Sequence, residues 1–267
     1  MKFKDQLNRN LYLDNNPQRI VSLVPSQTEL LVDLGLEENI VGITKFCVHP
    51  THLKKSKTIV GGTKKVNYKK IAALNPDIII CNKEENTEDI VSELEKHFSV
   101  YVSDIISFKD TFNMIEDFGN IFNSKQIASQ LVNNIRSKLD DFNNFIKQYP
   151  KKKVAYFIWP KPWMVAGGNN YINETLKLNR FENIFENAPD RYLEVYIEYL
   201  ASLNPDLKPD LIILPSEPFH FKKEHVEKLK KFIDCQFIFV DGEMFSWYGS
   251  RLLKALDYFR ELHTKIK

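Results

Sequence analysis

One uninterrupted stretch constrains the fold of this 267-residue chain more than any other feature. Residues 124–149 contain no proline or glycine, and apolar side chains recur there every three or four positions. The recurring residues are Ile127, Leu131, Ile135, Leu139, Phe142 and Ile146. This spacing predicts one amphipathic α-helix, roughly 39 Å long at about 1.5 Å per residue. Such a helix is long enough to run along the side of a whole lobe.

Strand and helix signals alternate on both sides of this helix. Before it, the β-branched and apolar runs predict strands at 20–24, 40–44, 78–81 and 100–102. After it, the same signals predict strands at 154–159, 211–214 and 237–240. Helices are expected between them, among others at 90–98, 171–178, 224–232 and 250–263. This alternation is typical of α/β proteins with parallel sheets.

The two halves also share a local pattern. In the first half Asn75-Pro76-Asp77 joins a short helix to a buried strand, and Asn204-Pro205-Asp206 precedes a buried strand in the second. We therefore predict an α/β fold of two Rossmann-like lobes with parallel central sheets, joined by one long helix. The predicted parts are an N-terminal lobe at 1–123, a linking backbone helix at 124–149 and a C-terminal lobe at 150–267.

Charge and composition exclude several classes of function. The 37 Lys and Arg against 35 Asp and Glu give a net charge of +2, which argues against a nucleic-acid binder with a strongly basic surface. No apolar run is long enough to cross a bilayer. The polar start of the chain lacks a signal peptide, so the sequence as written predicts a cytoplasmic protein. A preceding leader would instead make it periplasmic or membrane-anchored.

The loops that follow the predicted strands hold the candidate site residues, because open α/β sheets bind ligands at the carboxyl ends of their strands. In the first half these are Pro25, Ser26, Phe46, Cys47, His49, Gly62, Thr63 and Asn82. In the second half they are Trp163, Glu217, Phe219, Glu243, Phe245, Trp247, Tyr248 and Arg251. All three tryptophans fall in such loops, which favours an apolar ligand surface over ordinary core packing.

Two pairs of residues could carry further chemistry. Cys47 and His49 offer a thiolate and an imidazole that could face a soft metal, but no second pair completes a zinc site. Either residue could supply an axial ligand to the metal of a bound chelate. Alternatively, neither binds a ligand: Cys47 is a partly buried thiol, and His49 hydrogen-bonds within the protein. Glu217 and Glu243 could act as paired carboxylates or simply hydrogen-bond the backbone of polar loops.

Several short motifs, taken in their order along the chain, resemble those of class III periplasmic-type substrate-binding proteins, which are also called helical-backbone metal receptors. Within this family, the chain is most similar to the vitamin B12-binding and iron-siderophore-binding proteins of ABC transporters. The motifs lie at 5–9, 17–23, 25–30, 60–63, 71–77, 216–219 and 246–252, and they span nearly the whole chain. They include Pro25-Ser26-Gln27-Thr28-Glu29-Leu30 and Ser246-Trp247-Tyr248-Gly249-Ser250-Arg251-Leu252.

The resemblance implies a binding protein that holds a metal chelate in the cleft between two lobes and delivers it to an ABC transporter. Cobalamin or another corrinoid is the expected ligand, with an iron siderophore or haem as alternatives. By position, Trp163 resembles an aromatic residue that contacts the corrin in B12 binders, and Tyr192 falls near another such position. Asn82 stands where such proteins are expected to have a tryptophan. No resident cofactor and no enzymatic activity are implied, and we expect a monomer.

The resemblance also implies how a transporter would be engaged. Family members present one acidic residue on each lobe to arginines of the transporter. Glu198 fits the second-lobe position, but Lys69 occupies the first, which would place a cation against cations and weaken docking. Two other functions remain open at this point. The chain could be a cytosolic enzyme that uses Glu217, Glu243 or Cys47, or a scaffold without a small ligand.

Overall fold

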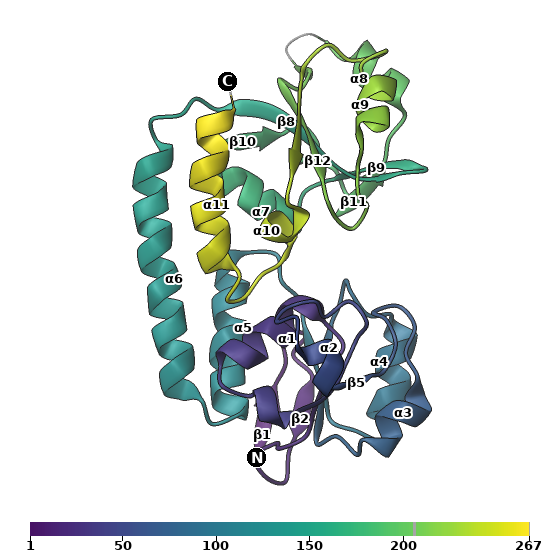
Figure 1. Cartoon of the computed structure of the whole chain (residues 1–267), viewed down its shortest axis with the longest axis vertical. Coiled ribbons are helices and arrows are strands. Elements are labelled where there is room, and N and C mark those ends of the chain that lie inside the picture. The colour runs from purple at the N-terminus through teal and green to yellow at the C-terminus, as the bar shows by residue number, and fades with distance from the viewer. Residues whose placement is uncertain (205–206, 267) are drawn as a thin grey trace. The chain divides into compact units, whose positions relative to one another are not determined.

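The computed structural model describes residues 1–204 and 207–266, and these form two compact units (Figure 1). The first unit comprises 1–105, 109–137 and 248–252, and the second comprises 106–108, 138–247 and 253–267. Pro205 and Asp206, two residues of the second Asn-Pro-Asp pattern, lie outside the described residues. The lobe boundaries set from the sequence stay a prediction.

The first unit is built on a parallel sheet with strand order β5-β4-β3-β6-β7. The strands are β3 (Ile20–Ser22), β4 (Ile40–Ile43), β5 (Thr58–Ile59), β6 (Ile78–Asn82) and β7 (Val100–Ser103). All residues of β3, β6 and β7 are buried, because helices cover both faces of a parallel sheet. The predicted strands of this half are thereby confirmed.

Helices and one hairpin complete the first unit. The helices are α1 (Pro25–Asp33), η1 (Glu37–Asn39), α2 (Leu53–Ser56), α3 (Tyr68–Ala73), α4 (Glu88–Glu95) and most of α5 (Phe108–Ile121). The antiparallel hairpin of β1 (Lys2–Lys4) and β2 (Asn10–Tyr12) stands apart from the sheet. Figure 1 shows α3 and α4 side by side along one side of this unit.

The long helix α6 (Lys125–Ile146) exists, but its first half buries a different face from the predicted one. Ile127 is 47% exposed, whereas Ala128 and Val132 are buried. The reason is α5, which the sequence pattern does not predict and which packs closely on α6. A Cβ atom on Gly119 would come within 2.6 Å of the Ala128 Cβ, so two small residues permit this approach. Residues of α6 up to Ser137 belong to the first unit, and the rest belong to the second.

The second unit contains a mixed sheet with strand order β11-β9-β8-β12-β13, and β10 pairs with the start of β8. The strands are β8 (Lys152–Pro160), β9 (Trp163–Ala166), β10 (Phe181–Asn183), β11 (Tyr192–Glu194), β12 (Leu211–Pro215) and β13 (Gln236–Val240). β8, β12 and β13 run parallel, as predicted, and β10, which the sequence does not predict, is parallel to β8. β9 and β11 add antiparallel strands that the sequence does not predict, because β9 turns back directly after β8.

Helices flank this second sheet on both sides in Figure 1, with α8 and α9 opposite α7 and α11. The helices are α7 (Tyr171–Leu178), α8 (Ile197–Ser202), α9 (Lys223–Leu229), α10 (Gly242–Ser246) and α11 (Leu252–Lys265). The C-terminal half of α6 packs against α11, where the rings of Phe142 and Phe259 lie 6.1 Å apart. No helix of the described residues is long and apolar enough to span a membrane.

His263 near the end of α11 makes the stability of the second unit depend on pH. Its Nε2 lies 3.0 Å from the side-chain oxygen of Asn179, whose amide nitrogen donates to Thr175. That oxygen is therefore an acceptor, and His263 donates to it. Burial lowers the pKa of His263 from 6.5 to about 4, because the enclosed ring disfavours the charged form.

We expect the free energy of unfolding to fall by about 2 kcal/mol between pH 6.5 and 4, because the unfolded chain binds a proton there that the folded chain does not. The loss stays below the full value of the shift because solvent screens part of the ring. Urea unfolding at several pH values, followed by circular dichroism, measures this. The variant His263→Gln keeps a donor to Asn179 and should remove this component; an unchanged pH dependence in the variant contradicts the assignment.

Candidate functional site

In the first unit, polar side chains join the loops at the carboxyl ends of the parallel strands. Asn82 ends β6, and its amide nitrogen donates to the backbone oxygen (3.2 Å) and the hydroxyl (3.0 Å) of Ser103. Its side-chain oxygen accepts the backbone N–H groups of Glu84 and Glu85 at 2.8 and 3.1 Å. These bonds use the full hydrogen-bonding capacity of the amide group. Asn82 therefore shapes the loop after β6, and its contact with a ligand stays a prediction.

Asn86 connects that loop to the neighbouring one. Its side-chain oxygen accepts the N–H of Asn82 at 2.9 Å, and its amide nitrogen donates to the backbone oxygen of Thr63 at 2.9 Å. The structure thus brings Gly62, Thr63 and Asn82, three of the predicted site residues, to one edge of the sheet. A Cβ atom on Gly62 would lie 3.1 Å from the Phe46 ring, so glycine lets this half-exposed ring lie close to the turn.

Glu85 is an acid at this edge that sequence reasoning did not identify. Burial raises the pKa of its carboxyl group, and Lys64 together with a hydrogen bond from the Thr63 side chain partly offsets that rise. The only signal in the sequence is its position directly after a buried strand, which Lys83 and Glu84 share. Only the tertiary structure shows that the Glu85 carboxyl group reaches the Thr63 side chain.

Helix α1 begins at the same edge and is buried over most of its length. Pro25 occupies its first turn, where a missing N–H costs nothing. The Gln27 amide donates to the hydroxyls of Ser103 (2.5 Å) and Tyr248 (3.0 Å), and Ser26 also hydrogen-bonds the Tyr248 hydroxyl. Pro25, Ser26 and Tyr248, all predicted site residues, therefore converge in the first unit.

A buried ion pair holds the segment that contains Tyr248. Arg251 donates from Nε and Nη2 to the two carboxylate oxygens of Glu29 at 2.7 and 3.0 Å, and both side chains are at most 5% exposed. Gly249, at a φ of 91°, brings the backbone of this segment next to Leu30 of α1. Arg251 thus has a structural role in the first unit, and its contact with a ligand stays a prediction.

Cys47 and His49 lie together in the loop after β4. The Cys47 thiol is fully buried, 3.1 Å from the Thr28 hydroxyl and 3.3 Å from the Thr44 hydroxyl. Burial raises its pKa, so it stays a protonated thiol that neither attacks a substrate nor binds a metal readily. The described residues contain no group of three or more His, Cys, Asp or Glu placed to hold a metal ion.

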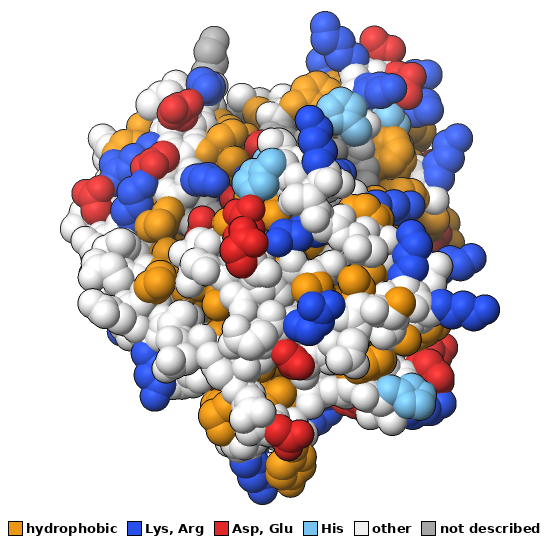
Figure 2. Space-filling view, turned by 60° about the horizontal axis from the view of Figure 1, so that its bottom comes forward, with side chains coloured by type: hydrophobic (Ala, Val, Ile, Leu, Met, Phe, Trp, Pro, Cys, Tyr) orange, Lys and Arg blue, Asp and Glu red, His pale blue; other side chains and the backbone are white. Residues whose placement is uncertain are grey.

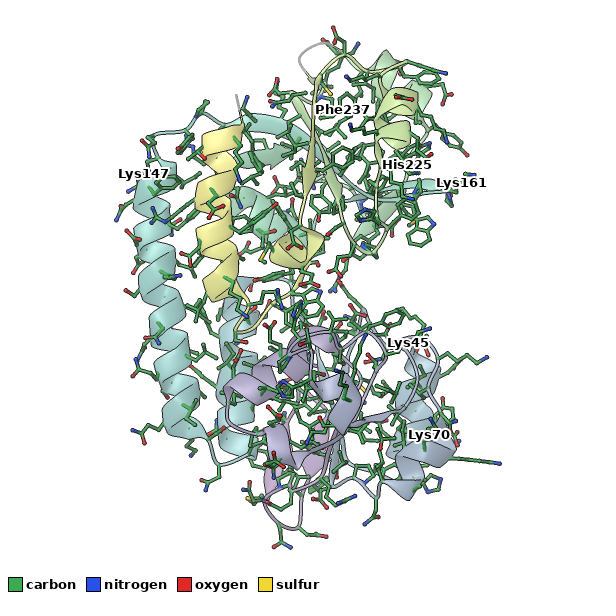
Figure 3. The ribbon with its side chains drawn as sticks, viewed as in Figure 1. Lys45, Lys70, Lys147, Lys161, His225 and Phe237 are labelled. Atoms are coloured by element: carbon green, nitrogen blue, oxygen red, sulfur yellow. The ribbon has the colours of Figure 1, made fainter. Side chains whose placement is uncertain are left out.

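In the second unit, an aromatic cluster forms at the carboxyl end of the sheet. It consists of Trp159, Trp163, Phe219, Phe221 and His225. The rings of Trp159 and Phe219 meet edge to face with centroids 5.3 Å apart, and the Trp163 and Phe221 rings stack at 6.4 Å. Trp159 is 39% exposed, so the cluster presents an aromatic surface to solvent. His225, labelled in Figure 3, reaches the cluster from α9.

Acidic residues lie beside this aromatic cluster. The Ser246 hydroxyl donates to Glu217 at 2.9 Å, and the Asp241 carboxylate accepts the N–H of Glu243 at 3.1 Å where α10 begins. A Cβ atom on Gly242 would come within 2.9 Å of Glu217, so only glycine fits where these loops meet. Glu217 thus lies in the loop beyond β12 and is tied to the last residue of α10, whereas Glu243, predicted in a loop, lies in the first turn of α10 beyond β13.

Two predicted site residues of this region lie inside the second unit. Phe245 is fully buried, and its ring packs against Tyr156 (5.5 Å) and Phe259 (4.8 Å). Trp247 is 8% exposed. Tyr192, on β11, pairs with Ala166 and is half-buried. Ligand contact by these three residues stays a prediction.

A cavity of about 320 Å³ opens at the carboxyl ends of β12 and β13. Its lining includes Ser216, His220, Phe221 and Phe239. Its volume is at the lower end of the range for ligand pockets. Sequence reasoning missed Phe221, His225 and Phe239, although the density of aromatic and histidine residues at 219–225 was a usable signal.

Glu198, predicted to dock a transporter, and Lys69, predicted to weaken that docking, are both exposed. Glu198 lies in the first turn of α8, flanked by Tyr196 and Tyr199, which are 73% and 54% exposed. Lys69 lies on α3 in the first unit. Docking by either residue stays a prediction.

The sequence and fold match known proteins over most of the chain. The sequence profile of the periplasmic binding protein family matches residues 20–233. An uncharacterized ABC transporter substrate-binding lipoprotein of Bacillus subtilis is 29% identical over 76% of this chain and 66% of its own. A vitamin B12-binding protein of Vibrio vulnificus is 28% identical over 70% and 69%. The chain thus spans about two thirds of the length of these curated relatives.

A solved structure agrees with the fold. The periplasmic haem-binding protein from Pseudomonas aeruginosa superposes with a TM-score of 0.78, covering 92% of this chain and 92% of its own, at 22% sequence identity. At this level of identity the likeness establishes the fold.

We expect Arg251→Ala to lower the free energy of unfolding by about 3–5 kcal/mol, because it removes the guanidinium group that contacts both oxygens of the buried Glu29 carboxylate. Urea unfolding at pH 7 measures the change. Lys151→Ala is the matched control, since the Lys151–Glu182 pair is exposed and its loss should cost about 0–1 kcal/mol. Equal costs for the two variants contradict the structural role of Arg251. The double variant Glu29→Gln, Arg251→Met should recover part of the loss.

Proposed function

Because this chain belongs to the periplasmic binding protein family, we propose that it binds a metal chelate, a corrinoid such as cobalamin, and passes it to an ABC transporter. The family and fold are those of substrate-binding proteins rather than enzymes. The vitamin B12-binding relative supports the choice of ligand. The lipoprotein relative supports a place at the outer side of the cytoplasmic membrane, rather than the cytoplasmic location suggested by the sequence alone.

The observation that carries this proposal is the aromatic cluster at the carboxyl end of the second sheet. Trp159 and Phe219 keep part of their rings exposed, although exposed aromatic surface costs free energy in water. A flat macrocycle with an apolar face would cover these rings and recover that cost. Ser216 and Glu217 in the adjacent loop offer polar atoms for the amide side chains at the rim of a corrinoid.

A haem or a ferric siderophore is the second candidate, and one residue favours it. His220 is exposed and lines the cavity beside Phe221 and Phe239. A neutral imidazole in that place can ligate a ferric haem, and the apolar rings can cover the porphyrin face. The haem-binding protein of the same fold supports this alternative.

The proposal of a transporter partner is based on the exposed face of α8. Glu198 offers a carboxylate there, and the exposed rings of Tyr196 and Tyr199 beside it are of the type that anchors protein interfaces. We infer that this face meets the permease. Lys69 occupies the corresponding place of the first unit and would oppose a basic permease surface.

Quenching of tryptophan fluorescence tests whether the proposed ligand binds. All three tryptophans lie in the second unit, which also contains the aromatic cluster. We expect cyanocobalamin, in the micromolar range, to quench the emission saturably. Phe219→Ala should weaken binding by about five- to tenfold, because it removes one ring of the aromatic surface. Tyr199→Ala, which removes an exposed ring far from the strand ends in sequence, is the matched control and should bind normally. Absence of saturable quenching by cobalamin, haem and ferric chelates alike contradicts the proposal.

His220→Ala separates the two ligand classes. If haem is the ligand, the variant should lose the Soret shift of a histidine-ligated haem and weaken haem binding at least tenfold. Cobalamin binding should change by less than threefold, because the imidazole is one of several residues around the cavity. Haem binding with an unchanged Soret band in the variant contradicts axial ligation by His220.

A further inference from the structure

The charge of the first unit is distributed unevenly along the chain. Residues 39–76 contain eight lysines, two histidines and no aspartate, glutamate or arginine. The remaining residues hold 29 Lys and Arg against 35 Asp and Glu, a net charge of 29 − 35 = −6. A nearly neutral protein therefore carries a block of +8 on one short stretch of sequence.

The fold gathers this stretch around β5, the edge strand of the first sheet. The Lys45 N–H donates to the oxygen of Gly61 at 2.8 Å, and the Gly62 N–H donates to the oxygen of Lys65 at 2.8 Å. The Lys70 ammonium donates to the oxygen of Ile59 at 3.2 Å. Along the chain, the short helix α2 precedes β5, and α3 follows it.

Six of the lysines form what we call the β5 cation cluster, because they are exposed and form no salt bridge among the described residues. They are Lys45, Lys54, Lys55, Lys65, Lys69 and Lys70. Elsewhere many lysines are neutralised, as in the pairs Lys83–Asp104 and Lys138–Asp257. Figure 3 shows Lys45 and Lys70 on the same outer side of the first unit, and Figure 2 shows that Lys and Arg side chains project from several parts of the molecular surface.

The acids nearest to this cluster already have other partners or lie at its border. Glu37 accepts a hydrogen bond from His52 at 2.7 Å. Lys64, which we leave out of the cluster, donates to the backbone oxygen of Glu84 and lies near Glu85. On α4, Glu93 pairs with Lys96, and Asp89 lies near Tyr68 at the border of the cluster. The cluster thus remains a positive surface.

We propose that the β5 cation cluster binds an anionic phospholipid surface, so that the first unit lies against the membrane. The cluster consists of lysines only, which are hydrated point charges suited to many headgroups, whereas protein interfaces favour arginine and are depleted of lysine. Phe46 and Tyr68, 49% and 41% exposed, adjoin Lys45 and Lys69, and exposed aromatic rings beside lysines suit a membrane interface.

Vesicle sedimentation tests the proposal. The full chain is mixed with vesicles of phosphatidylcholine alone or with about 30% phosphatidylglycerol, at low and high salt. We expect binding only to the anionic vesicles, and its loss in about 0.5 M NaCl, where the screening length falls to a few ångströms. The variant Lys54→Gln, Lys55→Gln, Lys65→Gln, Lys69→Gln should bind at least tenfold more weakly, since each lysine near such a surface contributes about fivefold.

The matched control removes the same charge from the second unit, with Lys147→Gln, Lys223→Gln, Lys228→Gln, Lys231→Gln, all at exposed positions. It should bind within threefold of the unchanged chain. Equal weakening of both variants, equal binding to zwitterionic vesicles, or no binding of the unchanged chain overturns the proposal. Binding to polyglutamate as tight as to anionic vesicles would assign the cluster to an acidic protein and also overturn it. Ligand quenching, measured separately, does not depend on this result.

Discussion

The buried ion pair between Glu29 and Arg251 is the interaction on which the candidate site of the first unit depends. Taking both charges out of water is costly, and the two-pronged contact at 2.7 and 3.0 Å helps to offset that cost. Through this contact, residues 248–252 become part of a unit otherwise built from the first half of the chain. Tyr248 is thereby held where Gln27 and Ser26 can bond its hydroxyl.

Around that pair, the strand-end loops of the first unit are linked mainly by polar contacts. Asn82, Asn86 and Gln27 each use side-chain amide groups to join loops that are distant in sequence. Such bonds are favourable because the groups are buried and would otherwise be unsatisfied. The second unit uses aromatic packing at the equivalent edge, with Trp159 and Phe219 left partly exposed. The loops at the strand ends are therefore held by chemically different contacts in the two units, mainly polar in the first and aromatic in the second.

The basic surface at β5 adds a feature that the family match does not require. Its lysines follow one another along 39–76 without any acid, and the sheet edge then displays them together. If this surface meets anionic headgroups, the protein would be held by charge close to the membrane in which a transporter lies. Lys69, which is unfavourable for docking to a basic permease, is favourable in this role.

The sequence by itself determined the α/β class, the main parallel strands and the long helix, because periodicity and buried apolar runs act over a few residues. It also placed Phe219 and Glu217 in the loop after a sheet strand, whereas Trp163, predicted in a loop, begins β9. Tertiary packing decided the rest. The close contact of Gly119 with Ala128 turned the first half of α6 away from Ile127. Arg251 bonds Glu29, and Asn82 bonds Ser103. These partners are distant in sequence, so no local pattern predicts the contacts.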